Sequence, residues 1–221
     1  MDINPVEIIL HLDVYLNQLV NNYGVWIYAI LFLVIFCETG LVVMPFLPGD
    51  SLLFIAGALS AAPATAAGVG LDPVLLGGLL MLAAILGDST NYVIGRTAGE
   101  RLFSNPNSKI FRRDYLQKTH DFYDRHGGKT VTMARFLPIF RTFAPFVAGV
   151  ARMPYPRFFG FSVFGTILWV GGLVTLGYFF GNVPFIKKNL SLLVVGIILL
   201  SLVPMIVGVV RSRLGRTPSK A

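Results

Sequence analysis

The fold is decided by residues 25–62, which read VWIYAILFLVIFCETGLVVMPFLPGDSLLFIAGALSAA. A helix needs about 20 mostly apolar residues to cross the hydrocarbon core of a bilayer, and each apolar run in this stretch is shorter than that. Between the runs lie two acids, Glu38 and Asp50, and the sequence Pro-Phe-Leu-Pro-Gly at 45–49. Two prolines and a glycine so close together stop a helix and turn the chain. The stretch is therefore predicted to be a re-entrant hairpin, which enters and leaves the membrane on one side.

A second broken apolar stretch lies at residues 130–150 and carries Arg135 and Arg141. Irregular backbone at membrane depth persists only where protein or a water-filled cavity satisfies its polar groups. We therefore expect a second re-entrant hairpin that faces the first. The residues expected to break the two hairpins are Pro45, Pro48, Gly49, Pro138, Pro145 and Gly149.

The composition of the whole chain is that of an integral membrane protein. Of its 221 residues, 55% are hydrophobic and 13% are charged, against about 25% charged in soluble globular domains. A water-soluble domain, a disordered tail, a disulfide scaffold and a DNA-binding module are excluded as the main interpretation, so no nucleic-acid partner is expected. The chain has one cysteine, Cys37, so no internal disulfide is expected either. The N-terminus shows no pattern of a secretory signal peptide.

These patterns predict an all-α membrane protein, with three transmembrane helices and two opposed re-entrant hairpins in a single domain over residues 1–221. Amphipathic helices are expected at the N-terminus and in a cytoplasmic loop. The expected segments are an amphipathic helix (1–22), the first hairpin (25–62), a transmembrane helix (73–99), the cytoplasmic loop and helix (100–129), the second hairpin (130–150), two transmembrane helices (157–182 and 189–210) and a basic tail (211–221).

The order of hairpin and then long helix occurs twice, which indicates an internal duplication. Gly95 and Gly99 end the first long helix as Gly177 and Gly181 end the second, at an offset of 82 residues. Small residues at this spacing also serve plain helix packing in membranes. All 18 Lys and Arg residues follow residue 95, and basic loops face the cytoplasm. The loop and the C-terminal tail are therefore expected to be cytoplasmic, which makes the halves an inverted repeat typical of transporters.

Four ionisable residues lie within the hairpins: Glu38, Asp50, Arg135 and Arg141. Each costs about 2.5 to 3.5 kcal/mol at the centre of a membrane helix, so all four must be paired or hydrated. We expect the acids and the arginines to neutralise each other between the hairpins. An arginine fork binds two phosphate oxygens at once. This chemistry predicts a substrate-headgroup site at Arg135 and Arg141, with Glu38 or Asp50 carrying a proton.

The same residues also have purely structural interpretations. Asp50 follows Pro48-Gly49 and could cap the helix that begins there. Glu38 could form a static ion pair with Arg135 that locks the hairpins together. Both interpretations stay open beside the functional ones.

A second polar face lies at the end of the first long helix. Its residues, Asp88, Asn91, Tyr92 and Arg96, are spaced to lie close to one side of that helix. A snorkelling Arg96 and an interfacial Tyr92 would account for part of this face. The histidines have no spacing typical of a metal site, and no nucleophile elbow, Walker loop or HExxH motif occurs. No catalytic residue, metal or cofactor is therefore expected, and the chain is not expected to be an enzyme.

A series of short motifs occurs along the chain in a specific order: Phe36 to Gly40, Pro45 to Asp50, Gly87-Asp88, Asn91-Tyr92, Ile94 to Arg96, His126 to Gly128, Arg135 to Pro138, Arg141, Pro145 and Ala148-Gly149. In these motifs, and over nearly all its length, the chain resembles the DedA family. The resemblance implies a bacterial inner-membrane protein with two opposed re-entrant hairpins. It also implies a role in envelope integrity, cell division and tolerance of alkaline pH or antimicrobial peptides. Glu38, Asp50, Arg135 and Arg141 match positions regarded as essential in that family, whose proton dependence falls on the acids.

Three functions are compatible with these observations. The resemblance favours a lipid translocase that moves undecaprenyl phosphate or a related anionic phospholipid, with membrane lipids and protons as its partners. The second function is a proton-coupled transporter of small ions or cationic drugs, with which anionic lipid should not compete. The third is a structural or partner-binding membrane protein whose buried ion pairs only hold the fold, so that exchanging the charges of Glu38 and Arg135 would preserve growth. A homo-oligomer fits each of them.

Overall fold

The computed structural model describes residues 23–41, 49–61, 71–103, 128–180, 183 and 196, and this described part is helical, without strands. Its elements are α3 (Trp26–Gly40), α4 (Gly49–Ser60), α5 (Pro73–Phe103), α7 (Lys129–Ala134), α8 (Pro138–Val150), α9 (Tyr155–Thr166), η1 (Ile167–Gly171) and α10 (Gly172–Phe180). Several expected segments lie outside the described residues: the N-terminal helix (1–22), nearly all of the third transmembrane helix (189–210), most of the loop (100–129), the basic tail (211–221), Pro45 and Pro48.

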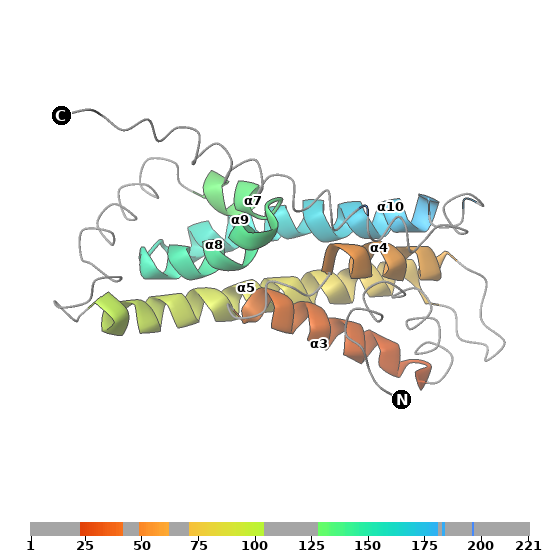
Figure 1. Ribbon diagram of the computed structural model, residues 1–221, viewed down its shortest axis with the longest axis horizontal. Helices are drawn as coiled ribbons and strands as arrows, with labels where there is room; N and C mark the ends of the chain where they lie inside the picture. Colours follow the sequence, from red (N-terminus) through yellow and green to blue (C-terminus); the bar gives the residue numbers. More distant parts are fainter. Residues whose placement is uncertain are drawn as a thin grey trace, which may run out of the picture.

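Two helices are long and apolar enough to cross a membrane. The first, Pro73–Ala98, is most of α5, and the second, Tyr155–Phe180, is the continuous helix formed by α9, η1 and α10. Both coincide with expected transmembrane helices, and both run along the long axis in Figure 1. The start of α5 is fixed by Asp72, whose Oδ1 accepts hydrogen bonds of 2.8 Å from two backbone N–H groups of the first turn. Pro73 follows at the first helical position, where its missing N–H costs nothing.

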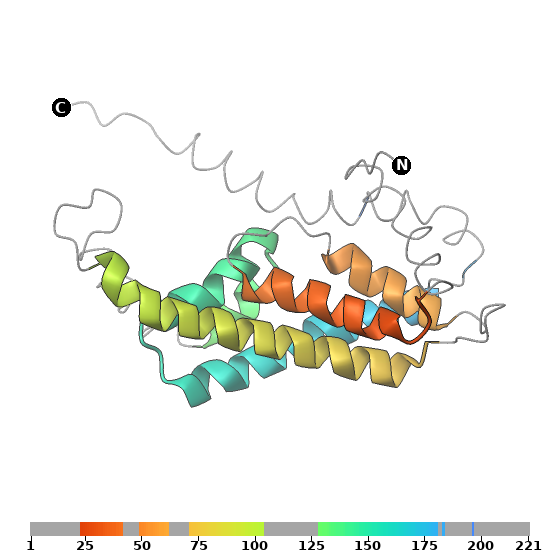
Figure 2. The ribbon, with the colours of Figure 1, turned by 90° about the horizontal axis from the view of Figure 1, so that it is seen from below.

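The shorter helices form two pairs, α3 with α4 and α7 with α8, and each pair packs in the same way. In the first pair, α3 lies on α5 and α4 lies on α10. In the second pair, α7 lies on α9 and α8 lies on α5. In each pair, the first helix therefore packs on the long helix that comes next in the chain. The second helix of the pair packs on the long helix of the other half. Figures 1 and 2 show this exchange, which supports an internal duplication.

Glycines bring the helix backbones together at equivalent positions in the two halves. A Cβ added at Gly177 would collide with the carbonyl oxygen of Phe54 on α4, and one added at Gly95 would collide with that of Phe146 on α8. Phe54 and Phe146 each begin the sequence Phe-X-Ala-Gly. Gly95 and Gly177, which the sequence aligns at an offset of 82 residues, therefore make corresponding contacts. Gly95 and Gly99 do not end their helix as expected, because α5 runs on to Phe103, and Gly181 lies outside the described residues.

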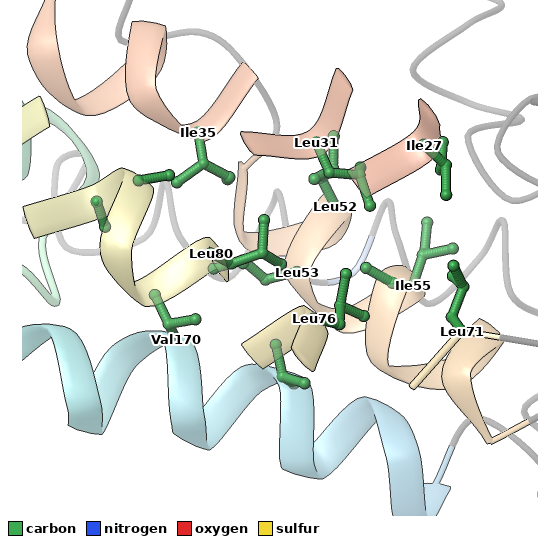
Figure 3. Packing of buried hydrophobic residues seen from close by; sticks show 14 of the residues in the cluster. Ile27, Leu31, Ile35, Leu52, Leu53, Ile55, Leu71, Leu76, Leu80 and Val170 are labelled. Carbon is green, nitrogen blue, oxygen red and sulfur yellow. The ribbon is translucent and has the colours of Figure 1, made fainter. Parts of the chain in front are cut away.

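The larger hydrophobic core lies between α3, α4, α5 and the second long helix. Ile27, Leu31 and Ile35 recur every four residues along α3 and are buried on one of its faces. They form one cluster with other buried apolar side chains, shown in Figure 3, which include Leu52, Leu53, Ile55, Leu71, Leu76, Leu80 and Val170. Large apolar side chains such as Val74 and Phe179 are exposed on the outside of the long helices, as expected where lipid replaces water.

The second helix pair differs from the expected hairpin in where its helix is interrupted. Breaks are predicted at Pro145 and Gly149, but α8 continues through both. Pro145 costs the helix one backbone donor without ending it. Gly149 allows close packing instead, because an added Cβ would collide with the carbonyl oxygen of Tyr92 on α5. The interruption precedes Pro138, where Leu137 has the extended backbone that a following proline favours.

Candidate functional site

Five buried or partly buried ionisable residues lie together where the two helix pairs meet the long helices, and we call them the charged centre. Glu38 is in the last turn of α3, Asp50 is in the first turn of α4, and Asp88 is on α5. Arg135 lies between α7 and α8, and Arg141 is in the first turn of α8. Four of the side chains are almost fully buried, whereas that of Asp50 is 21% exposed. Both acids and both arginines expected from the sequence are in the charged centre.

Arg141 connects the second helix pair to both helices of the first. Its Nη1 donates a hydrogen bond of 2.5 Å to Oδ1 of Asp50, and its Nη2 donates to Oε1 of Glu38. The carboxylate of Glu38 lies directly against the backbone at the start of α4, because a Cβ added at Gly49 would collide with it. Gly49 is therefore required where α4 begins, since any side chain there would displace the carboxylate that Arg141 binds.

Arg135 belongs to a different ion pair. Its Nη1 lies 2.6 Å from Oδ2 of Asp88 on α5. The same carboxylate oxygen accepts a hydrogen bond of 2.5 Å from Oγ of Ser162 on α9. This group therefore connects the interruption of the second helix pair to both long helices.

The observed pairing differs from the static pair between Glu38 and Arg135 that the sequence leaves open. Arg135 pairs with Asp88, and Glu38 pairs with Arg141. Asp88, expected on a separate polar face, is thus part of the charged centre. Asp50 lies within the first turn of α4, where a negative charge favours the helix N-terminus, and its carboxylate binds side chains of other helices.

Trp169 is a member of the site that the sequence reasoning misses. Its Nε1 donates a hydrogen bond of 2.8 Å to Oδ1 of Asp50. The guanidinium carbons of Arg135 and Arg141 lie 5.4 and 4.6 Å from the centroid of its ring, within cation–π range. Trp169 lies on η1, a short π-helix, and such widened turns are frequent at functional sites. The sequence signal that could identify Trp169 is its position in an apolar helix, because a buried indole N–H requires a hydrogen-bond acceptor.

The rest of the expected second polar face divides into two parts. Asn91 joins the helix pairs, because its Nδ2 donates hydrogen bonds of 3.1 Å to the carbonyl of Thr39 and 2.7 Å to that of Thr142. Tyr92 donates to a backbone carbonyl in the turn before α9, and Nη1 of Arg96 donates to the Tyr92 hydroxyl at 3.0 Å. Of this face, Asp88 therefore belongs to the charged centre, Asn91 joins α3 to α8, and Tyr92 and Arg96 hold α5 against the α8–α9 turn.

The charged centre has three carboxylates and two guanidiniums, so its net charge is −1 when all five groups are ionised. Three buried guanidinium nitrogens lack a hydrogen-bond partner among the described residues: Nε and Nη2 of Arg135, and Nε of Arg141. Buried donors and acceptors without partners are costly, which makes them candidates for contact with a ligand. The arrangement can therefore bind a proton or a cation at the acids and an anion at the arginines. Among the described residues no group of three His, Cys, Asp or Glu side chains is arranged to hold a metal ion.

Comparison with known proteins finds membrane proteins. The VTT domain matches residues 47–179 of the chain. Protein DedA of Escherichia coli (strain K12) is 57% identical over 94% of this chain and 93% of its own. Uncharacterized membrane protein Rv0364 of Mycobacterium tuberculosis is 43% identical over 81% of this chain and 77% of its own. Inner membrane protein YqjA of Escherichia coli (strain K12) is 35% identical over 84% of this chain and 82% of its own. No solved structure matches the chain.

Proposed function

The chain belongs to the DedA family of membrane proteins, which carry the VTT domain, and from this premise we propose that it is a membrane lipid translocase. Its cargo is undecaprenyl phosphate or a related anionic phospholipid, which it moves across the bacterial inner membrane in support of envelope integrity and cell division. In this proposal the two helix pairs are opposed re-entrant hairpins, the protein crosses the membrane several times, and its C-terminus is cytoplasmic. One observation carries the proposal: two buried guanidiniums lie beside a single indole ring at the junction of the two helix pairs.

The buried arginines suit a lipid headgroup because they provide fixed positive charge where water is largely excluded. Donors held in place in such surroundings bind an anion more strongly than they would in water. The headgroup alone has to enter the charged centre, since the acyl or prenyl tail can stay in the surrounding lipid. The exposed apolar side chains on the outer faces of the long helices provide a surface for that tail.

Proton coupling follows from the balance of charges. A phosphate headgroup would add negative charge to a centre whose net charge is already −1 with every group ionised. Protonation of Glu38 or Asp50 offsets part of that charge and weakens the hold of the acids on Arg141. Proton uptake and headgroup binding would then favour each other, as linked binding events must.

Reconstituted protein tests this proposal. Purified protein is placed in liposomes with labelled undecaprenyl phosphate, and the fraction of label that becomes accessible from the opposite leaflet is followed over time. Faster exchange than in empty liposomes supports the translocase. The same experiment with labelled phosphatidylglycerol shows whether the headgroup is selected. Exchange no faster than in empty liposomes, with folded protein verified by circular dichroism, would contradict it.

The excess of carboxylates favours a second candidate function, a proton-coupled transporter of small ions or cationic drugs. Three acids face two arginines, so one carboxylate charge in the charged centre is not matched by a guanidinium. A cation would bind at the acids, and the arginines would reset them after release. Cation flux that drives proton movement in the same liposomes, unaffected by added anionic lipid, would favour this candidate over the translocase.

A further inference from the structure

The two arginines of the charged centre differ in how much of each guanidinium is occupied. A guanidinium offers two bidentate edges to an anion, one formed by Nε and Nη2 and the other by the two Nη groups. Within the part of the chain that the structure describes, Nη1 is the one nitrogen of Arg135 that is engaged, by Oδ2 of Asp88 and by the carbonyl oxygen of Ser162 at 3.4 Å. Its Nε and Nη2 are buried and have no hydrogen-bond partner among the described residues. A complete bidentate edge of Arg135 thus has no hydrogen-bond partner from residues 23–41, 49–61, 71–103 or 128–180.

Arg141 presents no such edge. Its Nη1 and Nη2 are bound by Asp50 and Glu38, and its Nε has no partner in the described part of the chain. An anion that approached Arg141 edge-on would have to displace a carboxylate of one of these acids. Arg141 therefore serves as the clamp between the helix pairs, and Arg135 retains its binding capacity.

The surroundings of Arg135 hold that edge in place. Asp88 fixes Nη1 and is itself fixed by Ser162. The guanidinium carbon of Arg135 lies 5.4 Å from the centroid of the Trp169 ring. On α9, a Cβ added at Gly165 would lie 3.3 Å from Cδ of Arg135, so the helix leaves room for the arginine stem. A buried guanidinium with this support and two unused coplanar donors matches the geometry of an oxyanion.

We propose that the Nε and Nη2 edge of Arg135 is the subsite for a phosphate monoester, and that Arg141 is a structural clamp and not a phosphate ligand. This inference rests on the proposed function, which it refines by assigning the two arginines different tasks. Two oxygens of the phosphate accept the two donors, while Asp88 keeps its hold on Nη1. Asp88 is a positioning residue whose charge also limits the affinity of the subsite for an anion.

Binding can be measured at this subsite with the indole beside it. The chain has two tryptophans, and Trp26 is 69% exposed at the start of α3. In a Trp26→Phe background, Trp169 is the single tryptophan and reports on the charged centre. Its fluorescence is titrated with farnesyl phosphate, inorganic phosphate and farnesol. Saturable quenching by farnesyl phosphate and none by farnesol is expected. Equal quenching by inorganic phosphate would identify free phosphate as the ligand of the same subsite, whereas equal quenching by farnesol would overturn the proposal.

Variants in the same background separate the two arginines. Arg135→Lys keeps the charge and removes the bidentate edge, so the affinity for farnesyl phosphate should fall by about tenfold or more. Arg96→Lys is the matched control, because Arg96 is an exposed arginine that binds the Tyr92 hydroxyl outside the centre, and it should bind as the parent does. Unchanged affinity in Arg135→Lys, or a larger loss in Arg141→Lys than in Arg135→Lys, would overturn the proposal.

Asp88→Asn keeps an oxygen acceptor for Nη1 but removes the competing charge, so it should bind farnesyl phosphate more tightly. Should Arg135→Lys not fold, this variant decides alone, because unchanged or weaker binding in folded Asp88→Asn would contradict the proposed subsite.

The outcomes also separate this inference from the proposed function. Binding that depends on Arg135 in a protein that moves no lipid would remove the proposed function and keep this inference. Lipid movement by a protein whose binding of farnesyl phosphate is unaffected by Arg135→Lys would remove this inference and keep the proposed function.

Discussion

The indole nitrogen of Trp169 lies 2.8 Å from Oδ1 of Asp50 and donates a hydrogen bond to it. Trp169 is on the second long helix and Asp50 is at the start of α4, 119 residues earlier in the chain. The contact therefore joins a π-helical turn of the second half to the first helix pair. Since Arg141 binds the same carboxylate oxygen, Asp50 couples the position of the indole to the ion pairs.

Removal of the Trp169 side chain should impair lipid movement through this coupling. Trp169→Phe keeps part of the cation–π contact and loses the hydrogen bond, so we expect a severalfold slower exchange in liposomes. Trp169→Leu loses both contacts and should be slower still, because each contact contributes on the order of 1 kcal/mol. Trp26→Phe, at the exposed start of α3, is the control and should exchange at the rate of the wild type. Wild-type exchange by Trp169→Leu would show that the indole has no part in transport.

Double-mutant cycles should recover the ion pairs observed in the structure. Neutralisation of Asp88 and Arg135, singly and together, should give a coupling energy of about 0.5 to 3 kcal/mol in the free energy of unfolding. The combination of Glu38 and Arg135, which the sequence alone leaves open as an ion pair, should give a smaller value. Chemical unfolding in a mild detergent provides the measurement. A larger coupling for Glu38 with Arg135 than for Asp88 with Arg135 would contradict the observed pairing.

Substitution of the glycines at the helix contacts should destabilise the fold. Gly149→Ala places a methyl group against the carbonyl oxygen of Tyr92, and such overpacking costs about 1 to 3 kcal/mol. The measurement is the thermal unfolding of the purified protein in detergent. Gly78→Ala is the matched control on α5, because an added Cβ at Gly78 meets nothing within 4 Å. It should unfold at or above the wild-type temperature, since Ala favours helix over Gly. Equal midpoints for the two variants would show that the backbone contact is not tight.

Lipid movement should depend on external pH through the acids that share Arg141. The negative excess of the charged centre requires proton uptake when an anionic headgroup enters, so the exchange rate of the wild type should vary with pH. Glu38→Gln fixes one acid in an uncharged form and should make the pH profile flatter. Asp72→Asn is a control acid, because Asp72 caps α5 far along the chain from the centre and should leave the profile unchanged. A profile of Glu38→Gln identical to that of the wild type would show that Glu38 is not the coupling group.

Much of the fold is predictable from the sequence because the bilayer limits the choices. The apolar windows beginning at Pro73 and near Pro156 leave few alternatives to long helices, and the structure has them at these places. The offset of 82 residues between Gly95 and Gly177 likewise indicates an internal duplication, which the corresponding contacts of these two glycines support. The continuity of α8 through Pro145 is not predictable in this way, because a proline weakens a helix locally while the tertiary packing of α8 on α5 keeps it continuous.

The members of the charged centre are predictable in kind, but their pairing is not. Glu38, Asp50, Arg135 and Arg141 are conspicuous because charges are costly in a membrane. Which acid meets which arginine depends on the rotation and offset of packed helices, and sequence spacing does not determine these. Asp88 is therefore assigned to a separate face, and Trp169 is overlooked among the many apolar side chains of its helix. Ser162 gives no signal at all until α9 lies against the carboxylate of Asp88.

The most direct test of the central claim compares the movement of labelled undecaprenyl phosphate in liposomes that contain wild-type protein, Arg135→Lys or Arg96→Lys. The account predicts exchange well above that of empty liposomes for the wild type and for Arg96→Lys, and about tenfold slower exchange for Arg135→Lys, since the lysine cannot offer two coplanar donors. Equal exchange by all three proteins, each folded and inserted to the same extent, would contradict the claim that a phosphate headgroup passes through the charged centre.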